Sequence, residues 1–291
     1  MRRLPVPQVK ACDVFASAIG AFHDSGLLAR FTAAQAVIVS EETQYARLAQ
    51  AGRLDLVQAS ASVNSDLSVD EMKELYRKGM SSASGPARPF YDKLVTAAPH
   101  GTCPLCGQGR VRTLDHYLPQ SKYPALVVTP INLIPACRDC NTAKLNKAPT
   151  TAGEQTMHPY FDDFTSVRWL RAKVAESDPP VILYETRLPE GWPPVIAERL
   201  RRHMATFKLA TTFTLYAGEQ MSEIAGELQL LHSTGGADAV RQELQTRAGK
   251  REQTHRNSWQ TAMYFGLAES EWFCTQGLFL LKPTAVTTMA A

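Results

Sequence analysis

The chain has 291 residues, of which 44% are hydrophobic and 20% are charged, and its formal net charge is +3. This is the composition of an ordinary soluble protein, long enough for one core and additional lobes. A membrane-spanning segment is excluded, because no apolar run approaches the ~20 residues that cross a bilayer. The first residues lack the apolar stretch of a secretory signal, so we expect a cytoplasmic protein.

The first 98 residues are predicted to form a helical lobe. Apolar side chains recur at near-helical spacing over residues 8–58. Ser68 and Glu71 have the spacing of a capping box, which predicts the start of a further helix. A short helix over residues 90–98 is expected to follow a break that is rich in serine, glycine and proline.

Two Cys-x-x-Cys pairs are the most informative feature of the chain. The four cysteines are Cys103, Cys106, Cys137 and Cys140. Zinc binds four soft ligands at tetrahedral corners, and each Cys-x-x-Cys turn offers two thiolates to one ion. The two pairs therefore predict one structural Zn²⁺ ion. Two disulfides or a redox motif are the alternative, which a reducing compartment disfavours.

The segment between and after these pairs predicts a strand, a loop, a second strand and a helix. β-prone residues at 111–114 form the first extended run, and those at 126–129 form the second. Two prolines between these runs prevent a continuous helix. Residues 130–135 are predicted to be a loop, and residues 138–147 a helix.

Four polar residues of this segment are candidates for a metal-dependent hydrolytic site: Asp115, His116, Asn132 and Asn141. A neutral histidine can take a proton from water at physiological pH. A divalent ion held by Asp115 and Asn141 can bind a phosphate oxygen and stabilise the departing 3′ oxygen. In the alternative interpretation Asp115 caps a turn and His116 has a structural role.

Taken together, these motifs resemble the HNH endonuclease family, whose ββα-metal core has the same order of elements. The resemblance covers residues 101–147, about a sixth of the chain. It implies that His116 is the general base, that Asp115 is the acidic metal ligand, and that Asn132 holds the loop and orients His116. Asn141 replaces the final histidine of the family, which makes an H-N-N variant whose oxygen ligands suit Mg²⁺ (or Mn²⁺).

Charge supports a polyanionic substrate. Residues 101–147 contain six basic and two acidic side chains and carry a formal charge of +4, whereas the rest of the chain is near neutral. Because phosphate contacts supply most non-specific affinity for nucleic acids, this local excess predicts nucleic-acid binding. Lys144, one turn after Asn141, is the candidate phosphate contact. Downstream, His158 is open to three roles: a metal ligand, a contact to the cleaved strand, or an anchor of its own segment.

The remainder of the chain predicts a small β-hairpin followed by long helices. β-prone runs lie within residues 167–185, and helical patterns cover residues 194–232 and 237–265, with two glycines between them. The last residues, 283–291, are expected to form a tail.

The sequence thus predicts an α+β protein in three parts: a helical N-terminal lobe (1–98), an HNH-like nuclease core with a zinc site (99–165), and a mainly helical C-terminal lobe with a small β element (166–291). The resemblance implies a metal-dependent endonuclease that cuts double-stranded DNA. It also implies the cutting subunit of a bacterial restriction or anti-phage defence system, sometimes beside an ATPase partner. The alternative is a non-catalytic, zinc-stabilised subunit that binds nucleic acid or protein.

Overall fold

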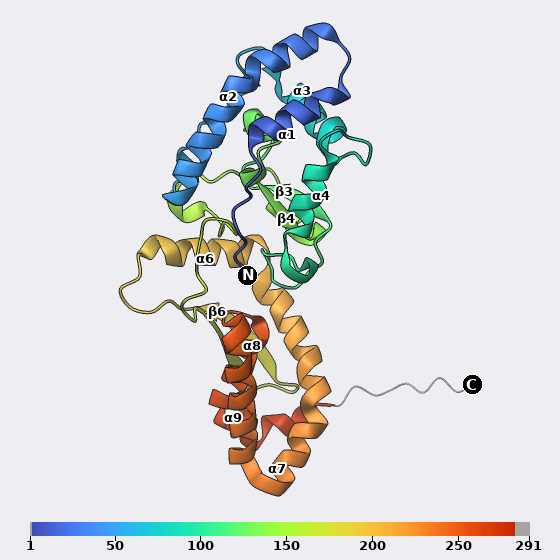
Figure 1. Ribbon diagram of the computed structural model, residues 1–291. Helices are drawn as coiled ribbons and strands as arrows, with labels where there is room; N and C mark the ends of the chain where they lie inside the picture. The colour runs from blue at the N-terminus through green and yellow to red at the C-terminus, as the bar shows by residue number, and fades with distance from the viewer. Residues whose placement is uncertain (1, 283–291) are drawn as a thin grey trace, which may run out of the picture. The chain divides into compact units, whose positions relative to one another are not determined.

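The computed structural model describes residues 2–282, and they form two compact units (Figure 1). Unit 1 contains the chain up to Asp163 together with Glu198–Phe207, and unit 2 contains Phe164–Ala197 and the chain from Lys208 onward. Among the described residues, helices predominate and each sheet has two strands, so the predicted α+β class is confirmed. Residues 2–98, predicted as a lobe of their own, lie in the same unit as residues 99–163 of the part predicted over 99–165.

The region predicted to be helical over residues 8–58 contains two α-helices, and a further helix begins at the predicted capping box. The Asp24 side chain accepts a hydrogen bond from the Leu27 amide at the start of one helix. The predicted capping box of Ser68 and Glu71 is confirmed, because each side chain accepts a hydrogen bond from the other residue's amide. The helices here are α1 (Ala11–Ala18), α2 (Ser25–Gln50), α3 (Val69–Glu74), the π-helical turns η3 (Leu75–Ser81) and α4 (Arg88–Thr96), and the paired short strands are β1 (Ser62–Val63) and β2 (Leu67–Ser68).

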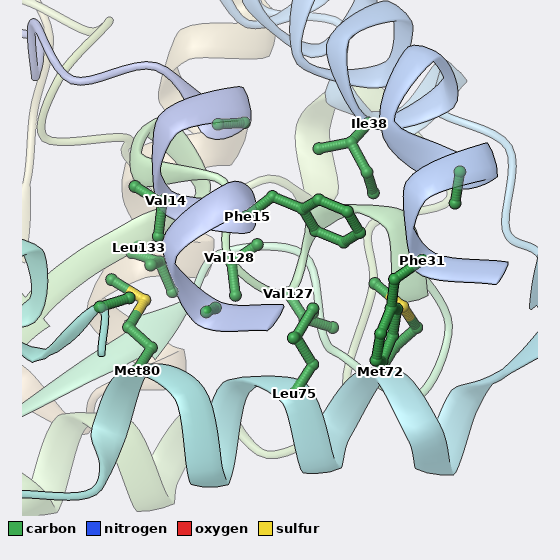
Figure 2. Packing of buried hydrophobic residues seen from close by; sticks show 14 of the residues in the cluster. Val14, Phe15, Phe31, Ile38, Met72, Leu75, Met80, Val127, Val128 and Leu133 are labelled. Carbon is green, nitrogen blue, oxygen red and sulfur yellow. The ribbon is translucent and has the colours of Figure 1, made fainter. Parts of the chain in front are cut away.

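One hydrophobic core joins these helices to the segment between the cysteine pairs. Figure 2 shows Phe15 of α1 and Leu75 of η3 gathered with Val127 and Leu133, which follow the first cysteine pair. All four side chains are buried, and each such burial contributes about 1.5–3 kcal/mol to stability. The shared core explains why the predicted lobe and nuclease core form one unit.

The segment between and after the cysteine pairs has the predicted order of elements, but its second strand was misplaced. β3 (Thr113–His116) pairs antiparallel with β4 (Leu133–Ala136), and α5 (Arg138–Lys144) follows. The β-prone run at 126–129 is not a strand: it begins in the 3-10 turn η5 (Pro124–Leu126) and buries its valines in the core. β-Propensity reflects how well a side chain fits a half-buried surface. The valines of this run bury their side chains in the core instead of pairing as a strand.

Unit 2 contains the predicted β-hairpin and long helices. β5 (Leu170–Ala175) and β6 (Val181–Thr186) are antiparallel, and the Thr214 hydroxyl donates to the Ile182 carbonyl over 2.7 Å. The predicted break at the glycine pair is confirmed at Gly236, whose φ of 69° and ψ of −169° interrupt the helix. The helices of this half are α6 (Pro194–Thr206, of which Glu198 onward belongs to unit 1), α7 (Leu209–His255), α8 (Trp259–Glu269) and α9 (Glu271–Thr275).

Within residues 2–282, no helix is both long and apolar enough to cross a membrane. The tail predicted for residues 283–291 lies outside the described residues.

Candidate active site and metal centre

The four paired cysteines come together as a buried cluster. Their Sγ atoms all lie within 4.8 Å of one another, and those of Cys106 and Cys137 are 3.9 Å apart. Four bonds of ~2.3 Å to a tetrahedral zinc ion place the sulfur atoms about 3.8 Å apart, so the cluster fits zinc. All six cysteines of the chain are free thiols, so the disulfide alternative does not describe this structure.

Backbone groups around the cluster favour thiolates, which are the form that binds zinc. The Gly109 amide donates to Cys106 Sγ over 3.3 Å, and the Cys140 amide donates to Cys137 Sγ over 3.5 Å. Hydrogen bonds from Cys103, from the other thiols and from this glycine amide lower the pKa of Cys106. A Cβ at Gly109 would lie 2.8 Å from Cys137 Sγ, so only glycine fits there.

A histidine from a distant part of the chain supports the first cysteine turn. His203 of α6 is fully buried and its Nε2 hydrogen bonds the Leu105 carbonyl over 2.8 Å, between Cys103 and Cys106. Its Nδ1 accepts from the Met157 amide over 3.3 Å. This contact could not be predicted from the sequence, because a lone histidine in a helix gives no signal of a partner almost a hundred residues away.

Replacing His203 with alanine is expected to destabilise unit 1 by about 3 kcal/mol at pH 7, because two buried polar groups lose their partners. Burial lowers the pKa of His203 to about 3, below the ordinary value of 6.5. The stability that the neutral ring contributes is therefore present above pH 6.5 and is lost as the pH falls. Urea denaturation should show this difference between wild type and variant shrinking by about 2 kcal/mol from pH 7 to pH 5. A constant difference would contradict a neutral, buried ring.

His116 lies at the end of β3 with both ring nitrogens engaged. Its Nε2 faces the Val127 carbonyl oxygen at 2.8 Å and must therefore carry the proton. Its Nδ1 is consequently unprotonated and accepts a hydrogen bond from the Gln120 amide nitrogen over 3.1 Å. The ring edge packs against Tyr76 of η3, with centroids 4.6 Å apart. Burial lowers the pKa of His116 to about 4, so the ring is neutral at physiological pH.

Asn132 holds the backbone of the loop that follows this histidine. Its side-chain oxygen accepts from the Leu118 amide over 2.8 Å, and its side-chain nitrogen donates to the carbonyls of Leu118 and Leu126. These bonds join both ends of the loop that separates the two strands. That loop includes the Val127 carbonyl that bonds His116.

Asp115 and Lys144 form a buried ion pair. Lys144 Nζ lies 3.1 Å from Asp115 Oδ2, and both side chains are less than a tenth exposed. The same ammonium donates a hydrogen bond to the His116 carbonyl and lies 5.6 Å from the centroid of the Tyr117 ring. Burial raises the pKa of Asp115, and the lysine opposes that shift. The phosphate contact predicted for Lys144 is not the arrangement found here, because its ammonium points inward to the carboxylate.

Asn141 lies on the helix that faces Asp115. Its side-chain nitrogen donates to the Thr113 hydroxyl over 3.4 Å, and Thr113 shares a strand face with Asp115, two residues on. The amide oxygen of Asn141 is thus the atom directed away from Thr113. A carboxylate and an amide oxygen are donors that suit Mg²⁺, which retains several waters as its other ligands. Asp115 and Asn141 thus offer oxygen donors of this kind, and Asp115 Oδ2 is paired with Lys144 Nζ at 3.1 Å.

His158 anchors its segment to the core. Its Nδ1 accepts from the Tyr160 amide over 3.2 Å, and its Nε2 lies 3.0 Å from the Tyr45 hydroxyl. Its own amide donates to Asp162, which also binds the Arg199 guanidinium. Both ring nitrogens therefore have protein partners, so of the three roles left open for His158 the structure favours the anchor.

No protein family model and no solved structure matches this chain. Among curated proteins, the chain is similar to "Protein ea31" of Escherichia phage lambda, with 26% identity over 234 residues. The aligned region covers 77% of this chain and 79% of the phage protein, so the similarity is not confined to the cysteine-rich segment.

Proposed function

We propose that the protein is a metal-dependent endonuclease of the HNH type that hydrolyses phosphodiester bonds, with double-stranded DNA as its substrate. The observation that carries the proposal is the state of His116: Nε2–H bonded to a carbonyl, an unprotonated Nδ1, and Asp115 as its neighbour. β3 carries Asp115 and His116, and α5, which carries Asn141, is joined to β3 by the bond from the Asn141 amide to Thr113. In this tautomer Nδ1 is the ring atom that can accept a proton from water, so it is the proposed general base.

In the proposed mechanism, His116 Nδ1 accepts a proton from the attacking water. The Val127 carbonyl stabilises the imidazolium that forms, because it accepts a hydrogen bond from Nε2–H throughout. Asn132 keeps that carbonyl in place through its bonds to the loop. When held by Asp115 and Asn141, Mg²⁺ or Mn²⁺ would neutralise charge on the phosphate and stabilise the departing 3′ oxygen.

Zn²⁺ in the four-cysteine cluster has a structural role in this proposal. Cys137 and Cys140 belong to the first turn of α5, and Cys137 is its N-cap residue. The ion therefore ties α5, which carries Asn141 and Lys144, to the first cysteine turn. A four-thiolate site has no open coordination position and does not itself perform hydrolysis.

We further propose that the protein is the cutting subunit of a bacterial restriction or anti-phage defence system, controlled by a partner such as an ATPase. The burial of the site supports control: Asp115, His116 and Lys144 are each less than a tenth exposed. A buried site requires a conformational change before a phosphodiester can reach it. The same burial favours a second candidate, a non-catalytic zinc-stabilised subunit that binds nucleic acid or protein.

Cleavage of supercoiled plasmid distinguishes these candidates. We expect cleavage with Mg²⁺ or Mn²⁺, none with EDTA, and a loss of about 10²–10⁴-fold in His116→Ala, the range typical of a missing general base. His23→Ala, which changes an exposed histidine, is the matched control and should cut like wild type. Zinc content should be equal in all three proteins.

Equal cleavage by wild type and His116→Ala would place the active site elsewhere. No cleavage by wild type, with or without its partner, would contradict the nuclease. Salt-dependent DNA binding without cleavage would then support the binding subunit.

A further inference from the structure

We propose that Gln120 is an autoinhibitory residue. Its side-chain amide is hydrogen bonded to Nδ1 of His116 and must move away before this nitrogen can accept a proton from water. The inference rests on the proposed nuclease function, since it concerns the general base of that reaction. The loop between β3 and β4 then has two roles: it holds the Val127 carbonyl against His116, and it blocks Nδ1 through Gln120.

The two hydrogen bonds of the His116 ring have defined directions. Because the Val127 carbonyl can only accept, His116 Nε2 donates to it and Nδ1 holds the one lone pair of the ring. The Gln120 amide nitrogen lies 3.1 Å from Nδ1 and donates into that lone pair. The reverse orientation of the amide would bring two acceptors together. The atom that the reaction needs is therefore already occupied by the protein.

The His116 ring is buried, and Gln120 lies between it and solvent. His116 is 7% exposed, and Tyr76 covers one of its edges with ring centroids 4.6 Å apart. Gln120 itself is only half-buried, so its side chain reaches from solvent to the buried nitrogen. Removal of this amide would uncover Nδ1 without disturbing the ring's bond to the carbonyl.

The strength of the contact suits a reversible closure. A single neutral hydrogen bond contributes little net stability, so a docking substrate or partner can displace the amide at small cost. Gln120 lies beside a turn in which the amides of Lys122 and Tyr123 both donate to the Pro119 carbonyl. A local rearrangement of this turn would move the side chain while β3 and β4 remain paired.

Carbethoxylation of histidines by diethyl pyrocarbonate tests the closure without using nuclease activity. The reagent acylates the unprotonated ring nitrogen, which in His116 is Nδ1. We expect Gln120→Ala to raise the modification rate of His116 on the order of tenfold, the effect of losing one such bond. Peptide mass spectrometry would measure it, with exposed His23 and His100 as internal references.

Lys122→Ala, which changes an exposed side chain on the same turn, is the matched control and should leave the rate at His116 unchanged. Gln120→Ser, too short to reach the ring, serves as the second variant if Gln120→Ala fails to fold. Zinc content and the denaturation midpoint would show that each variant is folded.

The outcomes separate the closure from the proposed function. Faster modification of His116 together with faster metal-dependent cleavage by Gln120→Ala confirms the closure. Faster modification without cleavage by any protein confirms the closing contact and contradicts the nuclease. An unchanged modification rate of His116 in Gln120→Ala overturns the proposal, whatever the rate of cleavage. Faster modification with slower cleavage also overturns it, and makes Gln120 a residue that positions the water.

Discussion

Replacing Cys137 with serine is expected to remove zinc from the protein and to abolish cooperative unfolding of unit 1. Cys137 combines two roles, because its sulfur belongs to the cluster and also caps the first turn of α5. Structural zinc contributes ~10–16 kcal/mol in small zinc domains, and whole domains are stable by only about 5–15 kcal/mol. Loss of even part of that binding energy removes most of the stability of the unit.

Zinc content by elemental analysis and thermal unfolding by circular dichroism would measure this effect. Cys274→Ser is the matched control, because Cys274 is also fully buried but lies in unit 2, outside the cluster. The control should keep a full zinc content. A Cys137→Ser protein with bound zinc and an unchanged transition would show that the cluster does not hold the ion.

Replacing Lys144 with methionine is expected to destabilise unit 1 by about 3–5 kcal/mol, because the Asp115 carboxylate is left buried without its partner. Methionine keeps most of the length of the side chain and removes the ammonium group with its charge and hydrogen bonds. The double variant Asp115→Asn/Lys144→Met should recover much of the loss, since the unpaired charge is then absent. Urea denaturation of both single variants and the double variant gives the coupling energy of the pair.

If Lys144→Met were as stable as wild type, the ammonium would not be the partner that keeps Asp115 charged. Lys93→Met, at an exposed position of α4, is the control for a lysine-to-methionine change. It is expected to change stability by less than about 0.5 kcal/mol.

Local signals in the sequence predicted the local parts of the site. The spacing of the cysteine pairs predicted the cluster, since two residues between cysteines suffice to aim both sulfurs at one point. The β-prone run at 111–114 predicted a strand, which the structure has at β3 (Thr113–His116), and the helix predicted over 138–147 is α5, which ends at Lys144. The position of β4 could not be predicted, because Val127 and Val128 satisfy their β-propensity in the core and the strand falls to Leu133–Ala136.

Contacts between segments that are distant in the sequence could not be predicted. Lys144 was predicted to contact phosphate, because a lysine is ordinarily solvated, and only the fold brings it to the Asp115 carboxylate. Tyr76 reaches His116 from π-helical turns that no sequence pattern announced. His158 and His203 likewise owe their roles to distant partners, which are Tyr45 for His158 and Leu105 for His203.

The return of α6 to unit 1 has a consequence for protein synthesis. Glu198–Phe207 completes unit 1 only after the whole β5–β6 hairpin has been translated. Until His203 leaves the ribosome, the Leu105 carbonyl and the Met157 amide lack their partner, although the four cysteines have long been made. A nascent chain that stops after the cysteine-rich segment therefore cannot complete the fold of unit 1 around that segment.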